Sequence, residues 1–272
     1  MSRQFTRDFF VEVAKGNVSG HSLVNKFGAA HDFDTGDGEV LIWDASDDSI
    51  TYDTNDASKY LKTTWGASTT ADIGVLSCAA AGTQTVEIQG VASDGTALVQ
   101  SFTLNGTTDV DLSATGSDYK RVFRIKNTSA TDFGGHVYVR VNGSAQDAGT
   151  AGVPDDAASI RAMVHSENNQ TEIACFTVAT ATTACMKRLY AYTSGGSRST
   201  NYTIKLYARP SGGVYQLKYK TAINDGISAE IVYDLPQSFS AGTDLIMTAE
   251  TEEAAITGSS VIAGFDLLIV DD

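Results

Sequence analysis

The clearest alternation of hydrophobic and polar residues lies in residues 201–224, NYTIKLYARPSGGVYQLKYKTAIN. Apolar side chains occupy every second position from Tyr202 to Ala208, and a second alternating run begins at Val214. A period of two predicts β-strands that each bury one face. Pro210-Ser-Gly-Gly213 supplies turn residues between the runs, so we expect an antiparallel hairpin. Because two strands bury too little apolar surface to be stable alone, more sheet is expected on both sides.

The same alternation predicts a first group of strands after about residue 70. Turn residues separate these strands at intervals of roughly ten residues, which is typical of a β-sandwich. We therefore expect a small β-sandwich over residues 67–150, and the stretch Gly143–Pro154, rich in small residues, is interpreted as an interdomain linker. The expected strands are Asp72–Cys78, Gln84–Ala92, Ala97–Leu104, Tyr119–Asn127 and Gly135–Asn142.

The second half of the chain, residues 151–272, shows a longer series of alternating segments. Eight antiparallel strands of this length favour a jelly-roll-like sandwich, which leaves few exposed edges. The expected strands are Ser159–His165, Glu172–Ala179, Ala184–Thr193, Tyr202–Arg209, Val214–Ala222, Ala229–Leu235, Asp244–Glu250 and Val261–Val270.

Residues 1–66 differ, because their large apolar residues are scattered among Gly and Asp without a sustained period. So long a segment with little regular structure is uncommon inside a compact domain, and it indicates an extended anchoring arm. Its apolar side chains need a surface against which they can be buried, and this surface belongs either to this chain's own sheets or to a neighbouring subunit. The expected anchors are Phe27, Leu41, Ile42 and Trp43, since large buried side chains carry most of an interface's energy.

Composition supports an all-β protein and narrows its partners. Hydrophobic residues make up 42% of the chain and charged residues only 19%, which is typical of a globular protein. The net charge of −14 disfavours nucleic acid as a partner, because a phosphate backbone is bound through basic residues. An acidic surface also keeps a β protein soluble.

The cysteines and the hydropathy pattern indicate in which cellular compartment the protein is expected. Cys78, Cys175 and Cys185 show no ligand spacing, so neither a disulfide framework nor a zinc site is expected and a reducing compartment fits. MSRQFTRDFF at the start has no apolar core of signal-peptide length, and no apolar run is long enough to predict a membrane span.

Candidate chemistry is sparse in this sequence. The acidic run Asp32–Glu39 has oxygen ligands that suit calcium, but it does not fit a helix–loop–helix calcium loop, and a solvated acidic turn is favoured. The four histidines are far apart, and no nucleotide-binding or nucleophile motif is present. We therefore expect no enzyme activity, no cofactor and no metal ion.

Carbohydrate binding is the principal alternative function. Tyrosine rings can stack against a sugar, and jelly-roll folds host many lectins. Aromatic residues at strand spacing more often belong to a core or an interface, so this interpretation ranks second. The candidate sugar contacts are Tyr190, Tyr207, Tyr215 and Tyr219.

The first segments to compare with known families are Val13–Gly28, with its VNKFG sequence, and Ile42-Trp43-Asp44 near the start of the chain. Their sequence resembles the N-terminal arm of accessory virion proteins of tailed bacteriophages. It departs from the expected pattern at Ala29-Ala30 and at Asp44–Asp48. Further similar segments are Leu104–Thr107, Tyr119–Arg124, Arg209-Pro with Gly213-Val-Tyr215, Thr243–Leu245 and Gly264–Asp271.

This resemblance implies a non-enzymatic structural role on a virion that is assembled in the host bacterial cytoplasm. The protein would be a capsid decoration, head-fibre or neck and collar component, docked through its N-terminal arm on capsid, portal, neck or fibre subunits. A homo-oligomer is expected, with a trimer as the first symmetry to consider. The alternative is a receptor- or glycan-binding module of a phage tail or fibre.

Overall fold

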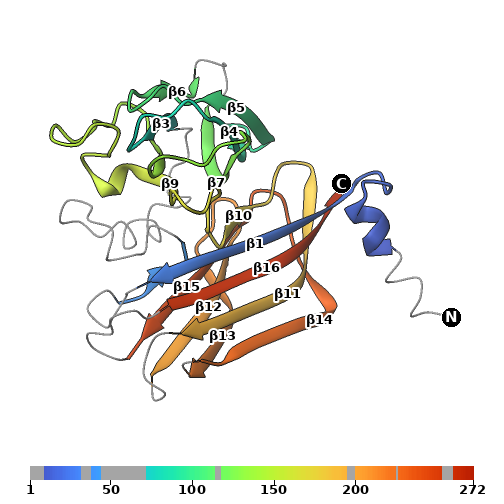
Figure 1. The fold of residues 1–272 in the computed structure, drawn as a ribbon. Helices are drawn as coiled ribbons and strands as arrows, with labels where there is room; N and C mark the ends of the chain where they lie inside the picture. Colours follow the sequence, from blue (N-terminus) through green and yellow to red (C-terminus); the bar gives the residue numbers. More distant parts are fainter. Residues whose placement is uncertain are drawn as a thin grey trace.

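A computed structural model describes residues 9–31, 38–43, 72–113, 118–194, 200–224, 226–252 and 260–272. Every strand pair in these ranges is antiparallel, and the only helical segments among them are short turns such as residues 9–14 and 157–159. A small domain stands on a larger β-sandwich (Figure 1). The predicted all-β class is therefore confirmed.

The larger sandwich includes one sheet that joins the first and last strands of the described chain. Strand β1 (His21–His31) pairs along its whole length with β16 (Ser260–Asp271). β16 then pairs with β11 (Thr182–Ser194), which pairs with β14 (Ser228–Phe239). The sheet order is β1-β16-β11-β14, so β1 and β14 form its two edges.

The second sheet of this sandwich has the order β10-β15-β12-β13. It consists of β10 (Cys175–Thr177), β15 (Asp244–Thr251), β12 (Asn201–Arg209) and β13 (Gln216–Asn224). The short strand β2 (Val40–Leu41) also pairs with β15, directly beyond β10 along the same edge. The strands β12 and β13 form the hairpin that the sequence predicts, with one bulge in their register.

β2 and β10 act as one strand that is interrupted by an insertion, because both lie against β15. When β2 and β10 are counted as one strand, the sandwich has eight strands, which can be numbered 1 to 8 along the chain. Their order is 1-8-3-6 in the sheet that contains β1 and 2-7-4-5 in the sheet that contains β15. This connectivity is that of jelly-roll sandwiches. The first strand of the eight is His21–His31, whereas the sequence pattern placed Ser159–His165 there.

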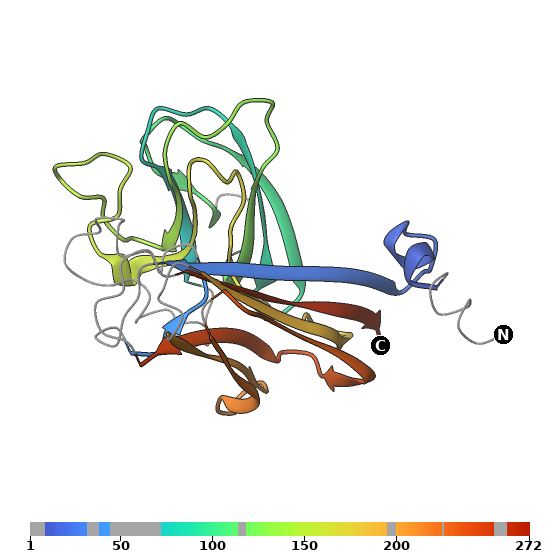
Figure 2. The ribbon, with the colours of Figure 1, turned by 60° about the horizontal axis from the view of Figure 1, so that its bottom comes forward.

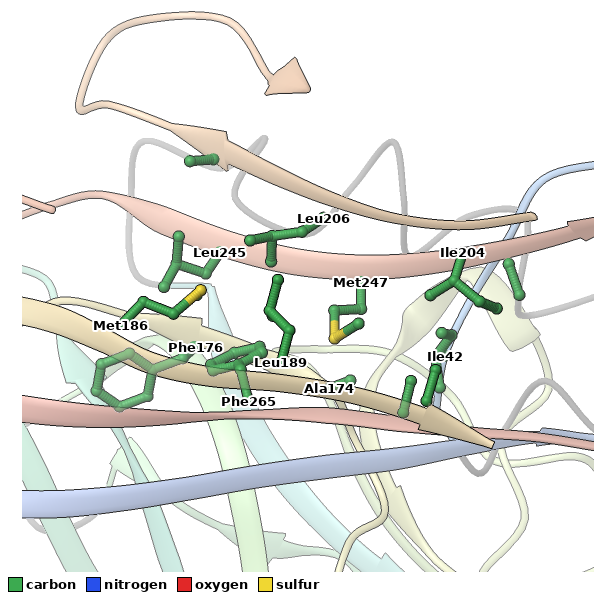
Figure 3. Packing of buried hydrophobic residues seen from close by; sticks show 14 of the residues in the cluster. Ile42, Ala174, Phe176, Met186, Leu189, Ile204, Leu206, Leu245, Met247 and Phe265 are labelled. Carbon is green, nitrogen blue, oxygen red and sulfur yellow. The ribbon is translucent and has the colours of Figure 1, made fainter. Parts of the chain in front are cut away.

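The core of the sandwich lies between these two sheets. Leu206, Leu245 and Met247 project from β12 and β15 toward Leu189 and Phe265 on the facing sheet (Figure 3). Each of these side chains is at most 2% exposed. Inward positions alternate with outward ones along β12, as its sequence predicts, whereas Leu217, predicted to face inward with Tyr215 and Tyr219 on the second strand of the hairpin, is 51% exposed.

The small domain is one antiparallel sheet that folds over its own core. Its order is β5-β4-β7-β3-β8-β9, with β6 paired to β3. Only the pair Ile73 and Tyr119 joins β3 to β7, and both halves contribute to one apolar cluster, so the sheet bends at this point. Its strands are β3 (Ile73–Cys78), β4 (Thr85–Ala92), β5 (Ala97–Thr103), β6 (Val110–Asp111), β7 (Tyr119–Asn127), β8 (Val137–Val141) and β9 (Ile160–Val164).

The structure differs from the predicted anchoring arm of residues 1–66. Residues 21–31 form strand β1 inside the sandwich, although their sequence lacks an apolar alternation. The reason is that Lys26, Gly28 and Ala30 occupy the positions of β1 that pair with core residues of β16. Small and basic residues at inward positions conceal the period of two. Residues 44–66 of this predicted arm lie outside the described residues.

The predicted boundary between the domains also differs. β9 pairs with β8 and completes the sheet of the small domain. The stretch Gly143–Pro154 connects these two strands, so its interpretation as an interdomain linker is wrong. Gly152 has φ +82° in this stretch, and a Cβ there would lie 1.9 Å from the carbonyl oxygen of Cys78. This connection is therefore packed against the small domain.

Candidate functional site

Three of the four predicted anchoring residues lie in the interior of this chain. Leu41, Ile42 and Trp43 each have 0% exposure, so the prediction that they contact a neighbouring subunit is wrong. Ile42 belongs to the sandwich core (Figure 3), and its backbone N–H donates to the carbonyl oxygen of Met247. Their apolar character reflects burial against this chain's own sheets.

Leu41 and Trp43 belong to a cluster between the two domains, which we call the junction cluster. Trp43 bridges to Ile173, and Ile246 of β15 faces the same cluster. Tyr138 of β8 contributes from the small domain. The cluster therefore holds the two domains together. Its buried members are Leu41, Trp43, Tyr138, Ile160, Met163, Ile173, Cys175 and Ile246.

Phe27, the fourth predicted anchor, lies elsewhere. It is half-buried on β1, opposite Gly264 of β16. Together with Leu23, Arg124 and Gln170 it lines a hollow of about 280 Å³ between the sandwich and the small domain. This position leaves Phe27 partly accessible, unlike the other three anchors.

The four candidate sugar-binding tyrosines do not form one patch. Tyr190 lies on β11 in the β1-β16-β11-β14 sheet, where its hydroxyl is 3.4 Å from Asn25 Nδ2. Tyr219 packs against the sandwich core, whereas Tyr207 and Tyr215 pack against the junction cluster. A single sugar ring cannot contact all four residues.

A cavity of about 440 Å³ lies where the turns of the two domains meet, and we call it the junction cavity. Three glycine-containing turns form its walls, together with residues of β7 and β10. Gly95, Gly212 and Gly242 have φ values of +84°, +72° and +74°, which favour glycine at these turns. The lining residues are Val91, Gly95, Lys120, Arg121, Thr177, Val178, Arg209, Pro210, Ser211, Gly212, Gly213, Gly242 and Asp244.

A buried carboxylate organises the charges beside this cavity. Asp244 is 4% exposed and begins β15. Its Oδ2 accepts hydrogen bonds from Arg209 Nη2 at 2.5 Å and Nε at 3.2 Å. Its Oδ1 accepts one from Thr177 Oγ1 at 2.6 Å and lies 3.4 Å from Arg121 Nε. Arg121 comes from the small domain, so this ion pair also spans the junction.

Positive charge exceeds negative charge among the residues that line the cavity. Lys120, Arg121 and Arg209 contribute three cations, and Asp244 contributes one carboxylate, which leaves a formal charge of +2. The Arg209 guanidinium stacks 4.7 Å from the centre of the Tyr215 ring. Burial raises the pKa of the Tyr215 phenol, and Asp244 raises it further. A net positive cavity is unusual in a chain of net charge −14.

Two histidines that are distant in sequence also meet in the structure. The rings of His136 and His165 lie 4.5 Å apart in an edge-on arrangement. Burial raises the pKa of the nearby Glu172 carboxyl, while His31 and His165 act in the opposite direction. Within the described residues no three His, Cys, Asp or Glu side chains are placed to hold a metal ion together. Most of the acidic run Asp32–Glu39 lies outside those residues, and Glu39 itself contacts Lys205 and Thr248.

The sequence contains the residues of the junction cavity in separate segments, and no motif links them into one site. Arg121, Arg209 and Asp244 each lie in a segment that carries the resemblance to phage proteins. The Pro210–Gly213 turn was predicted from its own residues. What the sequence did not show is that turns of both domains meet at one place.

Fold and site together define an all-β protein whose larger sandwich carries an inserted domain and a positively charged cavity at the junction. No helix within the part of the chain that the structure describes is long and apolar enough to cross a membrane.

No protein-family model and no curated protein matches this chain. A structure from the Gx strain of infectious bursal disease virus is 8% identical, covers 92% of this chain and 72% of its own, and has a TM-score of 0.24. The naturally empty top component of cowpea mosaic virus is 7% identical, with coverages of 74% and 82% and a TM-score of 0.21.

The tandem CBM22 domain of Xyn10C from Paenibacillus barcinonensis is 12% identical, with coverages of 90% and 94% and a TM-score of 0.24. All three TM-scores are far below 0.5, so none of these similarities defines a shared fold.

Proposed function

We propose that this protein is a non-enzymatic structural component of a bacteriophage particle, of the capsid decoration, head-fibre or neck and collar type. The resemblance in the sequence supports this class. One structural feature carries the proposed docking role, namely an apolar surface at the N-terminal end of β1. This surface replaces the buried residues Leu41, Ile42 and Trp43 as the expected contact with a neighbouring virion subunit.

We call the region formed by the helical turn of residues 9–14 and the start of β1 the N-terminal patch, and its exposed apolar residues are Phe9, Val11 and Leu23. These side chains are 36%, 49% and 42% exposed. Phe9 and Val11 belong to the helical turn of residues 9–14, which lies beyond the end of the sandwich (Figure 2). Leu23 also lines a mainly apolar hollow of about 360 Å³ with Phe10. Exposed apolar surface of this kind is typical of a protein interaction site.

The docking role predicts that Phe9→Ser combined with Val11→Ser reduces incorporation into particles at least tenfold. Losing two apolar contacts at an interface costs on the order of 2 kcal/mol, and 1.4 kcal/mol corresponds to a factor of ten. The measurement is the number of copies of this protein per purified phage particle, determined by quantitative mass spectrometry.

Val99→Ser serves as the matched control for this variant. Val99 is 60% exposed on β5 of the small domain, so its replacement removes a similar apolar group at another site. Normal incorporation of the double variant would contradict docking through the N-terminal patch. Absence of the wild-type protein from particles would contradict the virion role itself.

A homo-oligomer is the second part of the proposal, and the edges of the sandwich support it. Among the described residues β13 and β14 are the outermost strands of their sheets, so each has one edge to which no described strand is paired. Leu217 on β13 is 51% exposed, and Val232 and Leu235 on β14 are 65% and 88% exposed. These three residues, which we call the edge patch, form the apolar part of the proposed contact.

Charges around the edge patch favour a head-to-tail contact between copies. β13 carries the exposed Lys218 and Lys220, whereas β14 carries the exposed Glu230 and Asp234. β13 of one copy therefore complements β14 of the next, and a contact of this kind forms a ring when its rotation closes. A trimer is the ring that we propose.

We expect Val232→Ser combined with Leu235→Ser to convert the oligomer to a monomer. The reason is that exposed apolar side chains at the proposed contact lose their hydrophobic contribution, at about 25 cal/mol per Å² of buried apolar surface. Size-exclusion chromatography with light scattering measures the molar mass, and Val99→Ser again provides the control. A wild-type protein that stays monomeric at high concentration would refute this part of the proposal.

A further inference from the structure

We infer that the junction cavity binds an acidic saccharide through its carboxylate or sulfate group. This inference goes beyond the proposed docking role and shares no residue with the N-terminal patch or the edge patch. It rests on the charge of the cavity, on its size and on the fixed position of its guanidinium groups.

The charge of the cavity selects an anion. Arg121 and Arg209 both contact Asp244, which is the one carboxylate among the residues that line the cavity. Lys120 adds a third cation and is half-exposed, and no partner for its ammonium group is found among the described residues. Hydrogen bonds between such cations and a carboxylate or sulfate are charge-assisted and therefore stronger than neutral ones.

The arginines are positioned before any ligand binds. Arg121 is 5% exposed, and its Nη1 donates to the carbonyl oxygen of Lys120 at 2.7 Å. Arg209 is fixed by two hydrogen bonds to Asp244 and by the Tyr215 ring. A preorganised site loses little side-chain entropy on binding.

Side chains, and not the backbone of the turns, provide most of the recognition. The N–H groups of Gly95, Gly213 and Gly242 already donate to Ala92, Pro210 and Val178. The glycine turns therefore shape the cavity, while the cations supply its charge. This arrangement distinguishes the site from a phosphate-binding loop, in which backbone N–H groups surround the anion.

The size of the cavity favours an organic ligand over a free ion. Its volume of about 440 Å³ lies in the range of small-molecule sites, and Val91, Val178 and Pro210 add apolar surface to its walls. A sugar unit has apolar ring faces and polar edges, which suit such a mixed lining. The saccharide ring would fill the volume that an inorganic anion leaves empty.

Calorimetry and thermal unfolding of the full chain test this inference with four probes. These probes are a uronic-acid disaccharide, a sulfated disaccharide, the matched neutral disaccharide and inorganic sulfate. We expect one or both acidic disaccharides to bind and to raise the unfolding temperature, because a ligand that binds the folded state stabilises it. The neutral sugar is expected to leave the unfolding temperature unchanged.

Two variants locate the binding. Lys120→Met removes a cation that forms no ion pair with the described residues, and Ser211→Asp adds a carboxylate to a turn that lines the cavity. We expect each to weaken the binding of the acidic disaccharide about tenfold, the effect of 1.4 kcal/mol. Lys126→Met removes an equal charge elsewhere on β7 and should bind normally. Ser211→Asn matches aspartate in size but not in charge, so it should bind the acidic disaccharide more tightly than Ser211→Asp does.

Three results would overturn the inference. Failure of both acidic disaccharides to bind would exclude it, and so would binding that both variants leave unchanged. Inorganic sulfate binding as tightly as the sulfated disaccharide would show a site for free anions instead of a saccharide site. None of these measurements involves particles, so they are independent of the docking proposal.

Discussion

Replacement of Trp43 by alanine is expected to lower the free energy of unfolding by about 3–5 kcal/mol, the usual cost of removing a large aromatic side chain from a core. Trp43 has 0% exposure and lies in the junction cluster between residues of both domains. Its loss therefore leaves a cavity where the domains meet. Chemical denaturation, followed by circular dichroism, measures the change.

The matched control for this prediction is Trp43→Phe. The Nε1 atom of Trp43 is buried without a hydrogen-bond partner in the described part of the chain, so phenylalanine removes that polar atom and keeps much of the apolar volume. We expect the phenylalanine variant to lose clearly less stability than the alanine variant. Equal losses would show that the indole makes a specific contact beyond apolar packing.

Replacement of Asp244 by alanine is expected to cost a similar amount, about 3–5 kcal/mol, which is the usual effect of removing one partner from a buried ion pair. Arg121 would remain 5% exposed without its carboxylate, and Arg209 would lose two hydrogen bonds. The free energy of unfolding from chemical denaturation provides the measurement.

A second substitution separates the buried charge from other effects. In the background of Asp244→Ala, the change Arg121→Met removes the buried guanidinium that faced the lost carboxylate and is expected to restore part of the lost stability. Arg188→Met, at a residue paired with Glu230 and Asp266, is the control substitution in the same background. A double variant that is less stable than Asp244→Ala would contradict the assigned role of this ion pair.

Most strands could be predicted from the sequence because their inward residues are large and apolar. The pattern in Tyr202–Ala208 gives β12 directly, since Tyr202, Ile204 and Leu206 all enter the core. β1 could not be predicted in this way. The neighbours of its inward Lys26, Gly28 and Ala30 are supplied by β16 near the other end of the chain.

Gly28 shows why these small residues are required in β1. A Cβ at Gly28 would lie 2.3 Å from the carbonyl oxygen of Ile42 and 2.6 Å from the backbone nitrogen of Ala174. This close approach of three segments depends on tertiary structure, so no local pattern could predict it. A glycine within an apolar segment signals such an approach, but does not identify the other segments.

The functional surfaces were predicted less well than the fold, and the reason is again physical. Large apolar residues such as Trp43 indicate burial, but their sequence does not say whether the surface that buries them belongs to the same chain. The junction cavity combines Arg121 of one domain with Asp244 of the other. The small domain lies between β2 and β10 in the sequence, and both of these strands pair with β15, which begins at Asp244. This pairing places Arg121 of the small domain beside Asp244.

The interruption of one sandwich strand by a whole domain sets an order for folding during synthesis. The small domain consists of residues that are close in sequence, so its sheet can form while the ribosome is still translating the sandwich. β1 emerges earlier but has no partner until β16 is made. The sandwich therefore has a high contact order and closes late and slowly, on a domain that is already complete. During that interval the backbone hydrogen-bonding groups of β1 lack their partner strand β16, which leaves β1 open to pairing with another chain.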